Sequence, residues 1–285
     1  MSRRVLKTRI ITALVLIPLT LAALFGLPPR GWGAVTLAVV VVAAAEWAEL
    51  AALEKRSWLL FVGATLFTGC VLLLDPAAGF TSEHGWSGPV VSWICGAATV
   101  FWLLVAPTWL ISGRRVTSRL VLAIVGWLVL VATWVAVVAL QTRSPGLLLA
   151  MMAIVWIADT AAYFAGRRFG RRKLAPSISP GKTWEGVYGA LAAVAIYALL
   201  LLPFAAAAGY TRPLDATGAT IWVALALLLT GLSIIGDLFE SQLKRQRGVK
   251  DSGAILPGHG GVLDRIDALT AAMPPAALIA HHLLQ

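Results

Sequence analysis

Residues 119–140, RLVLAIVGWLVLVATWVAVVAL, form an apolar run in which Arg119 is the only charged side chain. A helix rises about 1.5 Å per residue, so a run of this length covers the roughly 30 Å of hydrocarbon in a bilayer. Such a segment is longer and more uniformly apolar than a helix needs to be on a soluble core. It therefore predicts a transmembrane helix.

The composition of the whole chain agrees with that prediction. Of its 285 residues, 59% are hydrophobic and 13% are charged, whereas ordinary soluble domains contain about 25% charged residues. A soluble fold could not bury so much apolar surface. The net charge of +10 would suggest nucleic acid binding in a soluble protein. Here the cations gather in short loops between apolar runs, so we expect membrane lipids, and no nucleic acid, as partners.

Nine apolar runs are separated by polar breaks, with no internal repeat and no extramembrane stretch long enough for a soluble domain. We therefore expect an all-α, polytopic membrane protein of one domain, residues 1–285, with N-terminal spans in 1–150 and a catalytic half in 151–285. The expected spans are 10–27, 32–53, 58–74, 89–112, 119–140, 147–165, 187–208, 219–238 and 266–284.

The loops between these spans carry very unequal numbers of cations. If the N-terminus is inside, all but three of the 23 lysine and arginine residues fall in inside segments, the exceptions being Arg30, Arg143 and Arg212. Short cytoplasmic loops collect Lys and Arg. We therefore expect a cell-membrane protein with its N-terminus in the cytoplasm, its C-terminus outside and its polar loops facing the cytoplasm.

Polar side chains cluster in two of the cytoplasmic segments. These are residues 167–186, RRFGRRKLAPSISPGKTWEG, and residues 237–267, DLFESQLKRQRGVKDSGAILPGHGGVLDRID. Four polar residues in the second segment have the spacing i, i+3, i+4 and i+7: Asp237, Glu240, Ser241 and Lys244. They share one face if the eighth span continues as a helix into the cytoplasm.

Asp264 and Asp267 share a face at the start of the last span, and the proline and glycines before them permit a tight reversal toward Asp237. Carboxylates that meet at two helix ends suggest a Mg²⁺ site, because Mg²⁺ commonly combines one or two carboxylates with substrate phosphates. Around these acids lie side chains that could donate hydrogen bonds to phosphate groups: Lys182, Lys244, Arg245, Arg247, Lys250, His259 and Arg265. Together they indicate phosphoryl or nucleotidyl transfer.

Some of these signals have simpler interpretations. Basic loops often only set topology or hold anionic headgroups. Asp159 is different, because an ionisable residue inside a span is costly and usually functional. The Gly-Lys-Thr triplet at 181–183 is not a phosphate-binding P-loop, since Pro176 stands where that motif needs its first glycine.

Three blocks of residues carry a resemblance to a known family. They are Ser241-x-Leu243-Lys244-Arg245, Lys250-Asp251-x-Gly253, and Leu256-Pro257-x-His259-Gly260-Gly261-Val262-x-Asp264-Arg265-Ile266-Asp267. Across residues 241–267 the sequence resembles, without a departure, the signature of the phosphatidate cytidylyltransferase family, also called CDP-diacylglycerol synthases.

Shorter matches to the same family lie before it. They are Asp159-Thr160-x-x-Tyr163-Phe164-x-Gly166-Arg167, Ser179-Pro180-x-Lys182-Thr183-x-Glu185-Gly186, and Gly236-Asp237-Leu238-x-Glu240-Ser241. Ala161 stands where the family pattern has glycine. The resemblance covers roughly the C-terminal half, whereas residues 1–150 match only as apolar spans.

The resemblance implies a Mg²⁺-dependent membrane enzyme that uses CTP and phosphatidic acid and releases pyrophosphate. The lipid phosphate would attack the α-phosphorus of CTP without a strong base, since a phosphomonoester has a second pKa of about 6. A second cation and a homodimer stay open. One alternative is a CTP-dependent polyprenol or lipid kinase of the same superfamily, which would leave CDP. A transporter, from another class, is disfavoured because charge gathers at the cytoplasmic edge.

Within this hypothesis each candidate residue has an expected role. The expected catalytic residues are Asp237, Asp264, Lys244, Ser241 and Lys182. The expected substrate-binding residues are Arg245, Lys250, Asp251, His259, Gly260, Gly261, Arg265, Glu185 and Asp159. The expected metal ligands are Asp237, Asp264, Asp267 and Glu240, and the first two are preferred because they sit at the two helix ends that converge.

Overall fold

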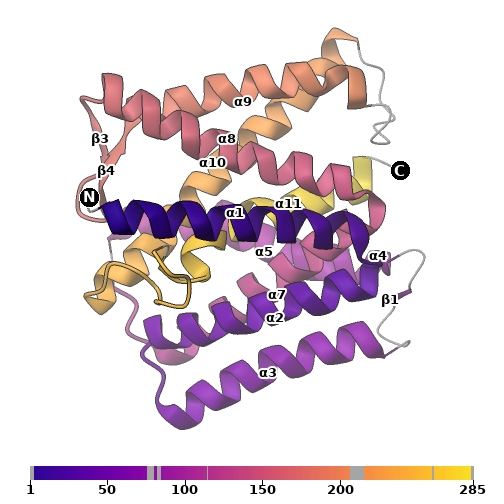
Figure 1. Ribbon diagram of the computed structural model, residues 1–285, viewed down its shortest axis with the longest axis vertical. Helices are drawn as coiled ribbons and strands as arrows, with labels where there is room; N and C mark the ends of the chain where they lie inside the picture. The colour runs from indigo at the N-terminus through magenta and orange to yellow at the C-terminus, as the bar shows by residue number, and fades with distance from the viewer. Residues whose placement is uncertain are drawn as a thin grey trace.

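The computed structural model describes residues 3–75, 80–81, 85–113, 115–205, 215–258 and 260–283. Its helices form a bundle (Figure 1). They are α1 (Arg3–Gly26), α2 (Pro29–Leu50), α3 (Lys55–Leu74), α4 (Gly88–Val90), η2 (Val91–Cys95), α5 (Gly96–Val100), η3 (Phe101–Val105), α6 (Ala106–Ser112), α7 (Arg119–Arg143), α8 (Pro145–Phe169), α9 (Trp184–Ala205), α10 (Ala216–Arg247) and α11 (Leu263–Leu283). Two antiparallel hairpins pair β1 (Phe80–Thr81) with β2 (Gly85–Trp86), and β3 (Lys173–Ala175) with β4 (Ser179–Thr183).

Seven helices in the described ranges are long and apolar enough to cross a membrane. They are α2, α3, the continuous unit Gly88–Ser112, α7, α8, α9 and α10. Seven of the nine expected spans thus coincide with helices of this kind. The first and last expected spans are helical too, as α1 and α11, but neither is among the seven. In α1 only the shorter stretch Leu14–Gly26 is an apolar helix, and α11 carries Asp264, Arg265 and Asp267 near its start.

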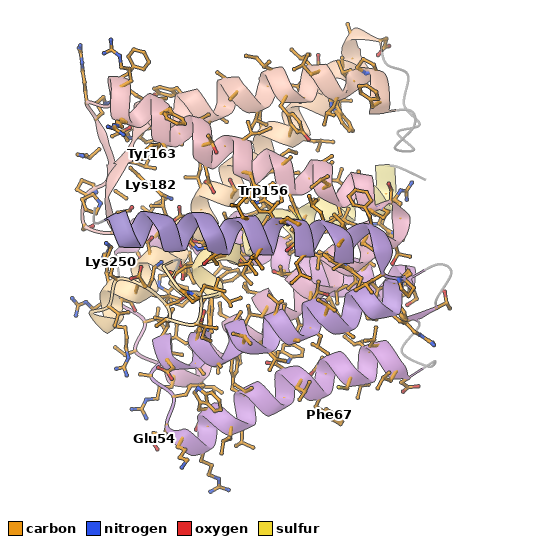
Figure 2. All side chains as sticks on the ribbon, viewed as in Figure 1. Glu54, Phe67, Trp156, Tyr163, Lys182 and Lys250 are labelled. Atoms are coloured by element: carbon orange, nitrogen blue, oxygen red, sulfur yellow. The ribbon has the colours of Figure 1, made fainter. Side chains whose placement is uncertain are left out.

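The outer surface of the bundle is apolar. Phe67 of α3 is 71% exposed, Trp93 of η2 is 79% exposed and Ile111 of α6 is 86% exposed. Figure 2 shows Phe67 on the outside of the bundle, midway along α3. Soluble proteins rarely expose large continuous apolar patches, whereas a helix that faces lipid does so along its whole length. The surface therefore fits the membrane fold expected from the sequence.

The centre of the bundle is α7, which contacts α2, α3, α8 and α11. In lipid, helices associate mainly through close packing, and small residues let them approach. A Cβ added to Gly126 of α7 would lie 2.1 Å from Nε1 of Trp47 on α2. That indole nitrogen donates a hydrogen bond to the carbonyl of Leu122 at 2.9 Å, so α2 and α7 are held in one register.

An aromatic cluster fixes the rotation of α10 about its axis. The fully buried ring of Phe239 lies 5.5 Å from the rings of Phe101 and Trp102 and 5.2 Å from that of Trp109. These three rings come from the Gly88–Ser112 unit, where two π-helical segments, η2 and η3, interrupt the regular helix. Because Phe239 is anchored there, its polar neighbours in α10, Asp237 and Glu240, face the loops at the end of the bundle.

The loops gather at two opposite ends of the bundle. In Figure 1, α1 begins at the end that holds the β3–β4 hairpin, whereas α11 ends at the other. The eighth expected span stops at residue 238, but α10 continues as a helix to Arg247. It ends at Gly248, whose φ of 74° is the left-handed conformation usual for a helix C-terminus. This extension is the condition under which the sequence placed Asp237, Glu240, Ser241 and Lys244 on one face of the helix.

Candidate active site

A buried lysine joins the end of α10 to the start of α11. The Nζ atom of Lys244 lies 2.6 Å from Oε2 of Glu240, one turn earlier, and 2.6 Å from Oδ1 of Asp264. The Lys244 side chain is only 10% exposed. A buried ammonium needs paired charge, and here two carboxylates supply it. The reversal expected before Asp264 is therefore present, and an antiparallel bridge between Leu256 and Gly260 forms part of it.

Backbone amides hold the second oxygen of Asp264. The amides of Ser252 and Gly261 donate to Oδ2 at 2.9 and 2.8 Å. Gly260 has a φ of 83°, and a Cβ there would lie 2.8 Å from Oδ2. Asp264 precedes the apolar part of α11, and its carboxyl has a pKa below the usual range: burial raises the pKa, but hydrogen bonds from Lys244 and Gly261 outweigh it. Gly260 and Gly261 thus act here through their backbone.

Lys182 reaches the same region from β4. Its Nζ atom lies 2.5 Å from Oδ2 of Asp237, and the hydroxyl of Ser241 donates to Oδ1 of Asp237 at 3.2 Å. Figure 2 places Lys182 at the end of the bundle where Lys250 also lies. The side chains of Lys182 and Asp237 are 26% and 29% exposed, so this pair is open to solvent while the Lys244 pair is not. All five expected catalytic residues therefore lie at the same end of the bundle.

Two further acids, Asp267 and Asp159, lie close to these pairs, which already include Glu240. Asp267 is within electrostatic range of Asp237 and Glu240, and its Oδ1 accepts a hydrogen bond from the Ala268 amide at 2.7 Å. Asp159 of α8 is within electrostatic range of Asp237 and Lys182. Glu240 is buried, and no N–H or O–H donor of the described residues reaches its Oε1. Such crowding of like charge is costly without cations nearby.

The remaining expected residues lie around this centre. The guanidinium of Arg245 donates hydrogen bonds to the backbone carbonyls of Ile178 and Val249 at 3.2 and 3.1 Å. Glu185 accepts from the amides of Arg171 and Arg172 at 3.1 and 3.2 Å and thereby closes the hairpin. Lys250, Asp251 and Arg265 are exposed at the rim. Of the expected site residues, His259 alone lies outside the described ones.

The carboxylates do not form a ready-made metal cage. Within the described ranges, no group of three or more His, Cys, Asp and Glu side chains is arranged to hold a metal ion. The two preferred ligands, Asp237 and Asp264, are each paired with a different lysine. Their oxygens are nevertheless the donor type that Mg²⁺ prefers. Oε1 of Glu240, which no donor among the described residues reaches, is a further carboxylate oxygen of the same kind.

Glu46 of α2 also belongs to this region, and our sequence analysis gave it no role. It is 4% exposed and accepts hydrogen bonds from Ser252, Val262 and Leu263. A signal for it exists in the sequence, because Glu46 interrupts the apolar stretch AVVVVAAAEWAEL at 38–50. An acid in an apolar helix is rarely without function, and the same argument had singled out Asp159.

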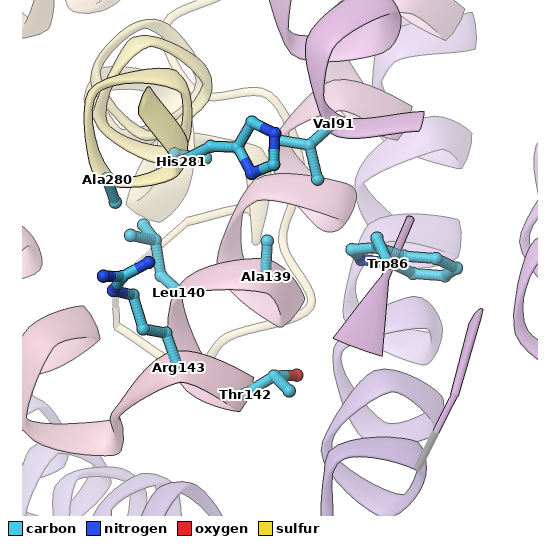
Figure 3. A pocket seen from close by; sticks show the side chains of 9 residues that line it. Trp86, Val91, Ala139, Leu140, Thr142, Arg143, Ala280 and His281 are labelled. Carbon is cyan, nitrogen blue, oxygen red and sulfur yellow. The ribbon is translucent and has the colours of Figure 1, made fainter. Parts of the chain in front are cut away.

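A separate pocket lies at the opposite end of the bundle. It has a volume of about 230 Å³ and is lined by Trp86, Val91, Ala139, Leu140, Thr142, Arg143, Ala277, Ala280 and His281. Figure 3 shows Arg143 and His281 reaching into it from different helices. None of the expected site residues that the structure describes lines this pocket, so we place the candidate active site at the end that holds Lys244 and Lys182.

Comparison with known proteins gives consistent matches over nearly the whole chain. A family model described as "Cytidylyltransferase family" matches residues 7–283. A phosphatidate cytidylyltransferase of Pseudomonas aeruginosa is 40% identical over 280 residues, covering 96% of both chains. Proteins of the same name from Haemophilus influenzae and Brucella suis are 34% and 37% identical, and the matches cover 94% of this chain and 96% and 90% of theirs.

Proposed function

The chain belongs to the cytidylyltransferase family, and on this premise we propose that it transfers the cytidylyl group of CTP to phosphatidic acid. The products are CDP-diacylglycerol and pyrophosphate, and the reaction belongs to phospholipid biosynthesis. The observation that supports this activity best is the meeting of Lys244, Glu240 and Asp264 at two helix ends. A cation held between acids beside a second lysine, Lys182, suits a reaction in which several phosphate groups come together.

The reaction needs positioned charge more than a strong base. An oxygen of the lipid phosphate forms a bond to the α-phosphorus of CTP, while the bond from that phosphorus to the oxygen shared with the β-phosphate breaks. Pyrophosphate leaves with that electron pair. The attacking phosphate is largely ionised at neutral pH, because its second pKa is about 6, so catalysis rests mainly on placing the two substrates and stabilising charge.

The residues of the site divide these tasks. Lys182 is partly exposed beside Asp237 and is placed to hold a phosphate of the incoming nucleotide. Lys244 is buried. It keeps the two helix ends together and contributes its positive charge to the site. Ser241, bonded to Asp237, orients that carboxylate. Arg245 and Glu185 act on the hairpin that carries Lys182, so we assign them positioning rather than direct contact with substrate.

The acids of the site are the proposed ligands for Mg²⁺. Asp237, Asp264, Asp267 and Glu240 would hold the ion, which supplies neutralisation of phosphate oxygens in reactions of this type. The fit is one of chemistry: all four offer carboxylate oxygens, and Oε1 of Glu240 is buried where no donor of the described part of the chain reaches it. When phosphates occupy the site, Lys182 can pair with them instead of Asp237, which frees that carboxylate.

The proposal includes the position of the enzyme in the cell. The apolar helices place it in a membrane, and we propose the cell membrane with the site facing the cytoplasm. The excess of lysine and arginine in the loops at the site end supports this orientation. CTP would then arrive from water and phosphatidic acid from the adjoining leaflet.

Identifying both products tests the reaction. The purified protein is incubated with CTP and phosphatidic acid, and lipid and aqueous products are identified by mass. CDP-diacylglycerol together with pyrophosphate supports cytidylyl transfer. A phosphorylated lipid together with CDP would show a kinase instead, since the attack would then fall on the γ-phosphorus. Flux of a solute in sealed vesicles without CTP would favour a transporter.

A further inference from the structure

Glu46 is buried at a place where a carboxylate is expensive. It lies near the end of α2 with 4% of its surface exposed, directly after the wholly apolar stretch 37–45. A buried carboxylate persists only where donors replace its water. Its partners therefore indicate what it is there to hold.

Among the described residues, its hydrogen-bond donors come from the loop that joins α10 to α11 and from the first residue of α11. The Val262 amide donates to Oε1 at 3.0 Å, and the Leu263 amide donates to Oε2 at 2.7 Å. The Ser252 hydroxyl also donates to Oε2, at 3.2 Å. The Val262 and Leu263 amides lie at the N-terminus of α11, where a negative charge is favourable. One side chain of the N-terminal half thus closes the loop that carries the family signature.

The fit around this carboxylate leaves no spare room. A Cβ on Gly253 would lie 2.4 Å from Oε1 of Glu46, and one on Gly261 would lie 2.5 Å from Oε2. Only glycine lets the backbone come so near. The two glycines and Glu46 are therefore complementary, although they are separated by most of the sequence.

A relay connects Glu46 to Asp264. The hydroxyl of Ser252 has one hydrogen and donates it to Glu46, so its lone pairs are left for the amide of Asp264, which donates to Ser252 Oγ at 3.3 Å. The amide of Ser252 in turn donates to Oδ2 of Asp264 at 2.9 Å. The orientation of Ser252 therefore sets both the backbone and the carboxylate of Asp264.

We propose that Glu46 is a positioning residue, which fixes the 249–262 loop and, through Ser252, aims the carboxylate of Asp264 into the site. Its effect on turnover rests on the proposed function, whereas its effect on the loop does not. Glu46 touches no substrate in this account. Its contribution reaches the reaction only through Asp264.

Glu46→Gln tests the proposal with little change of shape. The amide keeps one acceptor but points N–H groups at a backbone N–H or at Ser252, and it removes the negative charge. Glu49→Gln is the matched control, because Glu49 is an exposed acid one turn further along α2. Glu46→Asp keeps the charge but shortens the side chain, and Ser252→Ala breaks the relay while leaving the two backbone donors.

Hydrogen–deuterium exchange of the Val262 and Leu263 amides is the readout that does not depend on activity. We expect exchange to rise by roughly tenfold or more in Glu46→Gln, since hydrogen bonds to a charged group are lost, and to stay unchanged in Glu49→Gln. Ser252→Ala should leave these amides protected but lower kcat. The Mg²⁺ concentration for half-maximal turnover should rise about tenfold or more in Glu46→Gln and in Ser252→Ala, because loss of a residue that orients a metal ligand commonly weakens metal binding by such a factor.

Unchanged exchange and an unchanged Mg²⁺ requirement in folded Glu46→Gln would overturn the proposal. Faster exchange with normal turnover would overturn its second half, because the loop would then move without disturbing Asp264. If the unaltered protein shows no cytidylyl transfer, the proposed function fails, and the exchange measurement still decides whether Glu46 fixes the loop. A melting temperature for each variant shows whether it is folded.

Discussion

Nζ of Lys244 lies 2.6 Å from Oδ1 of Asp264, so a single buried ion pair ties the last turns of α10 to the first turn of α11. The second partner of Lys244, Glu240, is also buried and also 2.6 Å away. Two carboxyl groups and one lysine therefore meet at this point. Such a place can accept a further cation, and we attribute that role to Mg²⁺.

Replacement of Lys244 by Met should damage both stability and activity. Removal of one partner from a buried ion pair leaves uncompensated charge and typically costs about 3–5 kcal/mol. We expect a lower melting temperature in detergent and loss of turnover. Lys55→Met is the control, since Lys55 is exposed at the start of α3. A Lys244→Met variant as stable as the unaltered protein would contradict the account.

Asp237→Asn should separate activity from stability. Its pair with Lys182 is partly exposed, and pairs of that kind contribute at most about 1 kcal/mol. We expect a folded protein whose turnover is lower by at least about a hundredfold, as for loss of a main electrostatic contact in a transition state. Glu54→Gln, which removes an exposed acid paired with Arg119, should keep its turnover. Near-normal turnover of both Asp237→Asn and Asp264→Asn would exclude them as metal ligands.

Gly260→Ala should lower turnover through the backbone. Its φ of 83° is unfavourable for other residues, by about 1–2 kcal/mol, and the added Cβ would lie 2.8 Å from Oδ2 of Asp264. We expect the Asp264 carboxylate to be displaced and the Mg²⁺ requirement to rise. A Cβ at Gly63 in α3 would meet no atom of the described residues within 4 Å, so Gly63→Ala should behave normally. Equal Mg²⁺ requirements in the two variants would contradict the claim that Mg²⁺ binding depends on the position of the Asp264 carboxylate.

Removal of divalent cations should stop the reaction reversibly. The four acids of the site are proposed to act through Mg²⁺, so a chelator should abolish turnover and added Mg²⁺ should restore it. Incomplete restoration by Mg²⁺ alone would show that a second cation takes part. Full turnover in the presence of chelator would contradict the metal assignment.

The sequence predicted those parts of the site that depend on local periodicity. Asp237, Glu240, Ser241 and Lys244 share a face because α10 is a helix through all four positions, and spacing alone reveals that. The proline and glycines before Asp264 then indicated the loop that returns toward Asp237. The membrane fold followed from apolar runs in the same way, because span length is set by bilayer thickness.

Contacts between distant segments were beyond this kind of inference. The Ser252 hydroxyl and Glu46 are separated by 206 positions in sequence, and no periodicity connects them. The β3–β4 hairpin places Lys182 against Asp237, yet its sequence reads only as a polar loop. The guanidinium of Arg245, an expected substrate-binding residue, donates hydrogen bonds to the carbonyls of Ile178 and Val249, which its charge alone did not indicate. These pairings depend on tertiary packing.

The most direct test of the central claim uses CTP labelled at the α-phosphate. Detergent-purified protein is incubated with phosphatidic acid and this CTP, with and without Mg²⁺, and the label is followed into chloroform. We predict a labelled chloroform-soluble product that forms only with Mg²⁺ and is absent with Asp264→Asn. Label that stays in water while the lipid is consumed would contradict cytidylyl transfer.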